Sequence, residues 1–252
     1  MNRNNKKNER EGEFFKTKDG DTCTIINYIN NKEIYVAFES KRDNIIKTNY
    51  GNFQKKLISN PFSKTTFGKG YLGVGDYKCY NKNNQPTKEY ACWLGLFNRC
   101  YGKRESVYKE CSICEEWHCF QNFAKWFDEN YYEVENEKMA LDKDIKVKGN
   151  KIYSPDTCIF VPQRINNLIE KCNKSRGNLP IGVTKPGKKY KAQCNTLEKH
   201  VHIGMYNTQE EAFESYKNFK EKYIKEVAKQ YKEKIPFSLY EALINYKIEI
   251  ND

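Results

Sequence analysis

The chain has 252 residues, of which 38% are hydrophobic and 31% are charged. Its 44 lysine and arginine residues outnumber its 33 aspartate and glutamate residues, so the formal net charge at pH 7 is +11. An aromatic content of 14% argues against general disorder, because disordered chains are poor in aromatic residues. No stretch approaches the roughly 18 apolar residues that a membrane span requires. The excess of positive charge makes a polyanion the first partner to test.

The N-terminus has no apolar run of the kind that a secretory signal carries, which indicates a cytoplasmic protein. Its ten cysteines are then expected to be mostly reduced. Cys111 and Cys114 have a C-x-x-C spacing that can chelate zinc, and Cys100, Cys158 or Cys172 would have to complete the site. Because the sequence has no second C-x-x-C, free buried thiols are the expected state, and structural zinc is the minor alternative.

Residues 12–66 have the pattern of a small β module that follows a polar tail. Residues 23–29 and 32–38 are β-forming runs that flank Asn30-Asn31, a two-residue hairpin signal. Residues 44–48 are expected to add a third strand to the same sheet. We favour a module that stabilises its neighbour, and nucleic-acid binding is the alternative.

Two aromatic helices are predicted next. Residues 67–75 are glycine-rich but lack the GK[ST] of a phosphate loop, so we expect a link rich in turns. Residues 89–101 and 117–130 carry aromatic side chains at helical spacing. Such side chains are expected to form a core rather than a platform for stacking bases.

Residues 141–167 predict a strand, a turn, a second strand and a helix. Residues 141–147 alternate between apolar and charged residues, and residues 148–151 contain the glycine and asparagine of a tight turn. Residues 158–161 are short and apolar, which favours a second strand. Pro162 suits the first position of a helix whose apolar stripe would include Ile165, Leu168 and Ile169.

This arrangement resembles the ββα-metal core of HNH endonucleases. The resemblance places Asp142 and Asn166 at the positions of that family's metal ligands, and it implies Mg²⁺ or another divalent cation. Lys143 stands where the family has the histidine that activates water, and Thr157 lies near the position of the family's middle asparagine. The resemblance therefore supports the fold more than it supports catalysis.

Three interpretations of the missing base stay open. Lys143 could act as a base if its pKa were lowered, although Asp142 and Asp144 beside it oppose that change. His118 could instead approach from the helical wall. In the third interpretation the site is degenerate, and Lys143 holds a phosphate or merely flanks a strand with Asp142 and Asp144.

Residues 180–231 predict three short strands and a helix. Residues 181–184 and 190–194 are joined by the turn dipeptide Pro186-Gly187, and residues 200–204 form the third strand. The helix begins with a capping box at residues 208–211. The unit resembles the DNA-binding domain of the ethylene-response-factor (Apetala) type, which lays a three-stranded sheet in the major groove.

Polar residues of this unit and the basic segment before it are therefore candidate contacts with DNA. Lysine and arginine would mostly hold phosphates, whereas glutamine and histidine could read base edges. The candidates are Arg164, Lys174, Arg176, Thr184, Lys185, Lys188, Lys189, Lys191, Gln193, His200 and His202.

Taken together, the chain is expected to have an α+β fold and resembles HNH-type and Apetala-domain proteins of bacteriophages. The expected segments are a tail (1–11), the β module (12–66), the HNH-like domain (67–175), the Apetala-like domain (176–234) and a C-terminal helix and tail (235–252). The resemblance implies a metal-dependent endonuclease acting on double-stranded DNA. The alternative is a non-cleaving DNA-binding phage protein that acts as a regulator or an anti-defence factor such as an anti-CRISPR. RNA is the alternative partner.

Overall fold

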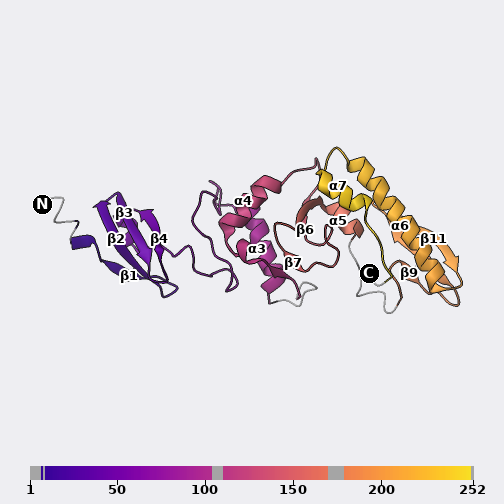
Figure 1. The fold of residues 1–252 in the computed structure, drawn as a ribbon, viewed down its shortest axis with the longest axis horizontal. Coiled ribbons are helices and arrows are strands. Elements are labelled where there is room, and N and C mark those ends of the chain that lie inside the picture. Colours follow the sequence, from indigo (N-terminus) through magenta and orange to yellow (C-terminus); the bar gives the residue numbers. More distant parts are fainter. Residues whose placement is uncertain (1–6, 8, 104–109, 170–178, 251–252) are drawn as a thin grey trace. The chain divides into compact units, whose positions relative to one another are not determined.

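The computed structural model describes residue 7 and residues 9–103, 110–169 and 179–250. Helices and several small sheets alternate along the chain, so the fold is α+β as predicted (Figure 1). The chain divides into two compact units, residues 1–104 with 115–125 and residues 105–114 with 126–252. None of the described helices combines the length and the apolar composition that crossing a bilayer would need.

The first unit begins with a four-stranded antiparallel sheet in which each strand pairs with the next. Its strands are β1 (Phe14–Lys16), β2 (Thr22–Asn30), β3 (Glu33–Phe38) and β4 (Lys41–Thr48). The turn between β2 and β3 is Asn31-Lys32, one residue later than predicted, because Asn30 still pairs with Glu33. Tyr50 and Phe53 of the short helix α2 (Tyr50–Gln54) complete the core of this sheet.

Aromatic residues build a second core within the first unit. They come from α3 (Lys88–Tyr101), the 3₁₀ turn η1 (Glu115–His118) and the start of α4 (Phe120–Asn130). The helix predicted from Trp117 begins at Phe120, because the preceding residues form the tighter 3₁₀ turn. The indole nitrogen of Trp93 donates a hydrogen bond to the backbone oxygen of Trp117 at 2.8 Å, and both rings are fully buried.

In the second unit, β6 (Met139–Asp142) pairs antiparallel with β8 (Ile159–Pro162), and α5 (Gln163–Ile169) follows directly. The first strand was predicted to continue to Val147, but it ends at Asp142. Oδ1 of Asp142 accepts the backbone N–H groups of Asp144 and Ile145 at 2.8 and 2.7 Å, which turns the chain out of the sheet. Pro162 is the last residue of β8 rather than the first of the helix.

The return from the turn is divided into two short strands. Its first part, β7 (Ile152–Tyr153), pairs with β5 (Ser112–Ile113) in parallel, and β8 follows after the break at Ser154-Pro155. Phe160 of β8 packs against Trp126 and Phe127 at the end of α4, with ring centroids 5.5 and 5.1 Å apart.

The C-terminal part of the second unit is a three-stranded antiparallel sheet covered by a long helix (Figure 1). The elements are β9 (Val183–Thr184), β10 (Tyr190–Asn195), β11 (His200–Tyr206), α6 (Gln209–Tyr231) and α7 (Phe237–Ile244). The predicted capping box is confirmed: Thr208 accepts the N–H of Glu211, whose side chain accepts the N–H of Thr208.

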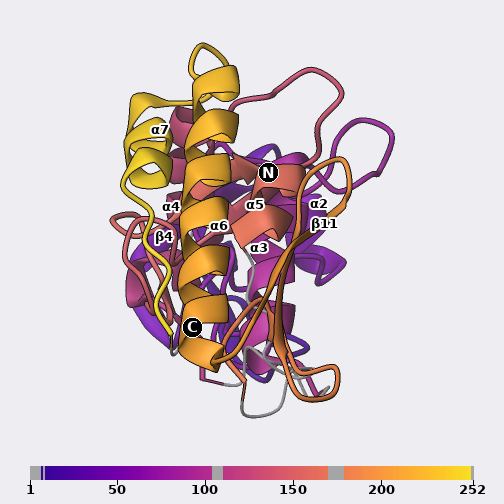
Figure 2. The same cartoon turned by 90° about the vertical axis from the view of Figure 1, so that its right-hand side faces the viewer.

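Helix α6 belongs to two hydrophobic cores. Ala212, Phe213 and Tyr216 in its first half pack under the sheet. Ile224, Val227 and Ala228 in its second half pack with α5, β8 and α7, and α7 lies alongside α6 (Figure 2). The boundary predicted near residue 175 falls outside the described residues, but side chains from both sides of it share this second core.

Two glycines of the sheet region allow a matched test of this packing. Gly182 and Gly187 both have positive φ angles, 75° and 76°. A methyl group at position 182 would overlap the ring of Tyr216, whereas one at position 187 meets nothing within 4 Å. We expect Gly187→Ala to lower the free energy of unfolding by about 1 kcal/mol through backbone strain alone. Gly182→Ala should cost about 3 kcal/mol, because overpacking adds to the strain.

Urea denaturation of the two variants, followed by tyrosine fluorescence and circular dichroism, checks this difference. Equal losses in the two variants would show that Tyr216 does not pack on Gly182.

Candidate functional site

The β9–β11 sheet has one apolar face and one polar face. In an antiparallel sheet, residues directly opposite each other project from the same face. The pairs Lys191–Thr184, Gln193–His202 and Asn195–His200 alternate with buried Ala192 and Cys194. The polar side chains therefore share the face that is turned away from α6. Five of the predicted contacts lie there: Thr184, Lys191, Gln193, His200 and His202.

Hydrogen bonds organise part of this outward face. Nδ1 of His200 lies 2.6 Å from Oδ1 of Asn195, and Nε2 lies 3.3 Å from Oε1 of Gln193. The imidazole thus bridges two carboxamides on neighbouring positions of β10. These contacts restrict the rotamers of three polar side chains that are exposed or half-buried, so less conformational entropy remains to be lost on binding.

Exposed lysines extend the polar face at its turn. Lys185, Lys188 and Lys189 lie in the connection between β9 and β10 and are exposed. The ammonium of Lys185 lies 4.8 Å from the ring centroid of Tyr190. Residues 179–195 contain no acidic residue, so positive charge is not neutralised locally in this part of the sequence.

The remaining predicted contacts do not join this face. A guanidinium nitrogen of Arg164 lies 3.6 Å from Oε1 of Glu137, which also accepts the hydroxyl of Tyr231 at 2.7 Å. Arg164 is therefore engaged by a carboxylate whose side chain is only 9% exposed. Lys174 and Arg176 lie outside the described residues.

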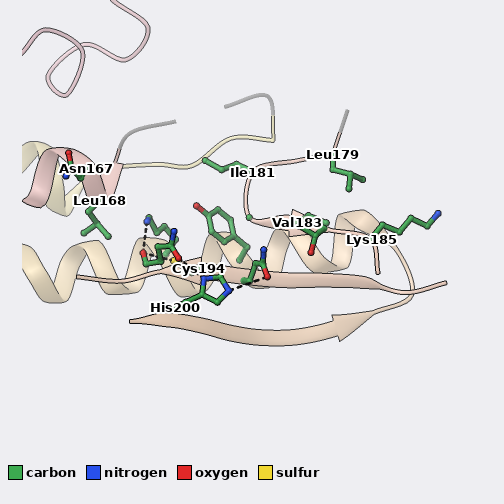
Figure 3. A pocket seen from close by; sticks show the side chains of 14 residues that line it. Asn167, Leu168, Leu179, Ile181, Val183, Lys185, Cys194 and His200 are labelled. Carbon is green, nitrogen blue, oxygen red and sulfur yellow. Dashed lines mark hydrogen bonds between the residues drawn. The ribbon is translucent and has the colours of Figure 1, made fainter. Parts of the chain in front are cut away.

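A cavity of about 630 Å³ opens beside the sheet (Figure 3). It lies between α5, the segment that carries Leu179 and Ile181, and the strands that carry Cys194 and His200. Thr184, Lys185, Gln193 and His200 of the predicted contacts line it together with the following residues: Asn167, Leu168, Gly182, Val183, Asn195, Tyr216 and Lys220.

The sequence prediction missed Lys220 and Asn167. Lys220 is 7% exposed, and its Nζ donates a hydrogen bond to the backbone oxygen of Asn195 at 3.4 Å. It occupies the apolar stripe of α6, four residues after buried Tyr216 and four before buried Ile224. A lysine at that spacing is the signal that could have identified it.

The candidate catalytic residues of the ββα segment are engaged with one another. Lys143 is 8% exposed, and its Nζ lies 3.5 Å from Oδ2 of Asp144 and 5.8 Å from the ring centroid of Tyr153. Burial, followed by the negative charge of Asp144, raises the pKa of Asp142 to about 6. Asp142 therefore lies in a site where burial favours the neutral form of its carboxyl group.

The two predicted metal ligands, Asp142 and Asn166, lie at the end of β6 and on α5. Oδ1 of Asp142 is used by two backbone N–H groups. Over the described ranges, no three His, Cys, Asp or Glu residues gather closely enough to hold a metal ion. Asn166 is half-buried on α5. Magnesium prefers several oxygen ligands, and one of the two carboxylate oxygens of Asp142 is already used to close this turn.

The other candidate residues lie as follows. His118 is part of η1 in the first unit, where its ring packs 5.9 Å from that of Phe97. Cys111 and Cys114 flank β5 in the second unit. Burial raises the pKa of the Cys111 and Cys158 thiols, which disfavours the thiolate form that binds zinc. Cys172 is outside the described residues.

Comparisons with protein-family models, with curated proteins and with solved structures found no match for this chain.

The raised pKa of Asp142 predicts a dependence of stability on pH. A carboxyl whose pKa is about 6 when folded and 3.8 when unfolded holds its proton more tightly in the folded state, so stability falls as pH rises from about 4 to 6. Asp142→Asn keeps an oxygen for both N–H groups and removes the charge. We expect this variant to melt at a higher temperature than the wild type at pH 7.5, with the difference shrinking toward pH 4.

Thermal melts at pH 4, 5, 6 and 7.5 measure this dependence, with Asp156→Asn, which changes an exposed carboxylate, as the matched control. A difference in melting temperature that does not change over this range would contradict the desolvation of Asp142.

Proposed function

We propose that this protein binds duplex DNA through the outward face of the β9–β11 sheet. The observation that carries the proposal is the division of this sheet into two faces. One face buries Val183, Ala192 and Cys194 against α6. The other presents cationic, amide and imidazole side chains, and no acidic residue occurs from residue 179 to 195.

The geometry of the sheet suits the major groove. That groove, about 12 Å wide, admits a two-stranded β-ribbon. Strands β10 and β11 pair from Tyr190–Tyr206 to Asn195–His200, with a shift in register between Ala192 and Gln193. Lys191 and the lysines of the turn would hold phosphates, which fixes the position of the sheet on the duplex. Gln193 and His202 face the same way and would contact base edges.

The same geometry favours DNA over double-stranded RNA. The major groove of A-form RNA is deep and narrow, so a sheet cannot enter it, whereas the major groove of B-form DNA is open. A protein that binds DNA through this face without cleaving it would act by covering its binding site on the duplex. The resemblance to bacteriophage proteins supports a role as a regulator or an anti-defence factor.

Salt dependence tests the proposal. If about four phosphates are contacted, the logarithm of affinity should fall with the logarithm of salt concentration at a slope near −3.6. We expect Lys191→Gln to reduce the magnitude of that slope by about 0.9, because one phosphate contact is lost. Fluorescence anisotropy with a labelled duplex between 50 and 300 mM NaCl measures both values.

Lys229→Gln is the matched control, because Lys229 is exposed near the end of α6 and is remote in sequence from the sheet. A slope near zero for the wild type would remove nucleic acid as the partner.

DNA cleavage at the ββα segment is the second candidate function. The path of β6, β8 and α5 favours it, because Asp142 ends the first strand and Asn166 lies on the helix, as in the HNH arrangement. The use of Oδ1 of Asp142 by two backbone N–H groups does not favour it. We therefore expect purified protein to bind supercoiled plasmid without nicking it in the presence of Mg²⁺ or Mn²⁺.

Agarose gels of plasmid incubated with the protein check this expectation. Nicking that depends on the cation, is lost in Asp142→Ala and persists in Asp156→Asn would establish the endonuclease instead.

A further inference from the structure

We infer that the open face of the β1–β4 sheet in the first unit is a binding site for single-stranded DNA. Phe14 stacks on an unpaired base, and Arg42 holds a phosphate of the strand. This face is separate from the β9–β11 sheet, and only the choice of DNA as the nucleic acid rests on the proposed function.

The β1–β4 sheet has one covered face and one open face. On the covered face, Phe15 packs with Tyr50 and Phe53 of α2. The described residues before β1 lie on that side as well, because the guanidinium carbon of Arg10 is 3.8 Å from the ring centroid of Tyr50. Since successive side chains of a strand point to opposite faces, the neighbours of Phe15 in β1 project from the open face.

The open face is hollowed beside Phe14. Phe14 pairs with Thr24 and Thr24 pairs with Ala37, so these three residues form a row across the sheet on one face. The side chains of threonine and alanine are short, and a cavity of about 540 Å³ lies over them. All nine residues that line it fall between residues 14 and 42, a stretch of the first unit that the structure describes without a gap.

Phe14 provides a surface for stacking. It is 68% exposed, although phenylalanine is one of the residue types most often buried. No ring of the described chain stacks on it. Exposed Ile26 adds apolar surface to the same cavity. A flat apolar ring that is open to solvent at the side of a cavity is suited to contact with the face of a nucleic-acid base.

The charged side chains of the cavity leave a cation available. Glu39 is the only acidic residue among the nine described lining residues, which include Lys16 and Arg42. Nζ of Lys16 donates a hydrogen bond to Oγ1 of Thr22 at 2.9 Å, and that hydroxyl donates to Oε2 of Glu39 at 2.7 Å. Arg42 is exposed and has no acidic partner within the described residues. Its planar guanidinium is therefore available to a phosphate, whose geometry it matches.

This combination of groups fits a single strand rather than a duplex. In a duplex, each base is stacked between its neighbours, so a ring on a sheet meets no open base face. In a single strand, bases can be splayed out onto aromatic side chains while cations hold the phosphates. The proposed function makes DNA the source, because a duplex bound by the β9–β11 sheet offers unpaired bases wherever it opens.

Phe14→Ala and Arg42→Gln separate stacking from charge in anisotropy titrations of the full chain with a labelled single-stranded oligodeoxynucleotide. We expect Phe14→Ala to weaken binding by about fivefold or more without changing its salt dependence, because stacking on an apolar ring releases no counterions. Arg42→Gln should reduce the magnitude of the slope of log affinity against log salt by about 0.7, the value for one phosphate of a single strand.

Two matched variants control for loss of a ring and loss of a charge. Phe237→Ala removes a ring that is 72% exposed on α7, and Lys55→Gln removes an exposed cation at the end of α2. Neither should change the affinity or the slope. Circular dichroism confirms that all four variants are folded. Absence of single-stranded binding, or binding that is unchanged in both Phe14→Ala and Arg42→Gln, would overturn the site.

A blunt duplex measured in parallel separates this site from the proposed function. Normal duplex binding by Phe14→Ala, together with weakened single-stranded binding, supports two separate surfaces. Single-stranded binding that depends on Phe14, in a chain that does not bind the duplex, would overturn the proposed function and leave this site standing. An RNA of the same sequence that binds more tightly than the DNA would overturn DNA as the occupant.

Photocrosslinking locates the contact directly. An oligodeoxynucleotide that carries 5-iodouracil crosslinks to an aromatic side chain on which that base stacks. We expect the crosslinked peptide to contain Phe14, and we expect the crosslink to be lost in Phe14→Ala and kept in Phe237→Ala. Crosslinks confined to residues 179–206 would place the single strand on the β9–β11 sheet and overturn the site.

Discussion

The second unit depends on the burial of two different stretches of α6 in two different cores. The first half of the helix covers the apolar face of the β9–β11 sheet through Ala212, Phe213 and Tyr216. The second half, through Ile224, Val227 and Ala228, packs with α5, β8 and α7. Because a helix of 23 residues is stiff over its length, this double burial fixes the sheet relative to the ββα segment. The cavity beside β10 is a consequence, since its walls come from both parts.

The same arrangement explains why binding, rather than hydrolysis, is the function that the geometry supports best. The sheet is covered on one face only, so its polar side chains and the lysines of its turn stay available to a partner. In the ββα segment, Asp142 is used to turn the backbone, and Lys143 is buried against Asp144 and Tyr153. A side chain that closes a turn contributes to folding, and a cation bound at Oδ1 of Asp142 would compete with its two backbone N–H groups.

Local signals predicted much of this fold, and non-local packing decided the rest. Alternation, turn residues and the capping box at Thr208 identified the C-terminal strands and their helix, because those features act within a few residues. The end of β6 at Asp142 was missed, because the alternation of apolar and charged residues through residue 147 is typical of a strand. The strand ends earlier because the side chain of Asp142 accepts two backbone N–H groups. Lys220 was missed because lysine is expected on solvated faces, and only the packing of α6 under β10 buries it. Arg164, a predicted DNA contact, also forms an ion pair with Glu137, which is distant in sequence.

The most direct test of the DNA-binding face is a titration of ¹⁵N-labelled protein with duplex DNA, followed by amide chemical shifts. The account predicts that the largest changes lie on β9, β10 and β11 and in the lysine-rich turn between β9 and β10, including Thr184, Lys191, Gln193 and His202. Changes confined to the four-stranded sheet of the first unit, or no changes at DNA concentrations that saturate binding by anisotropy, would contradict it.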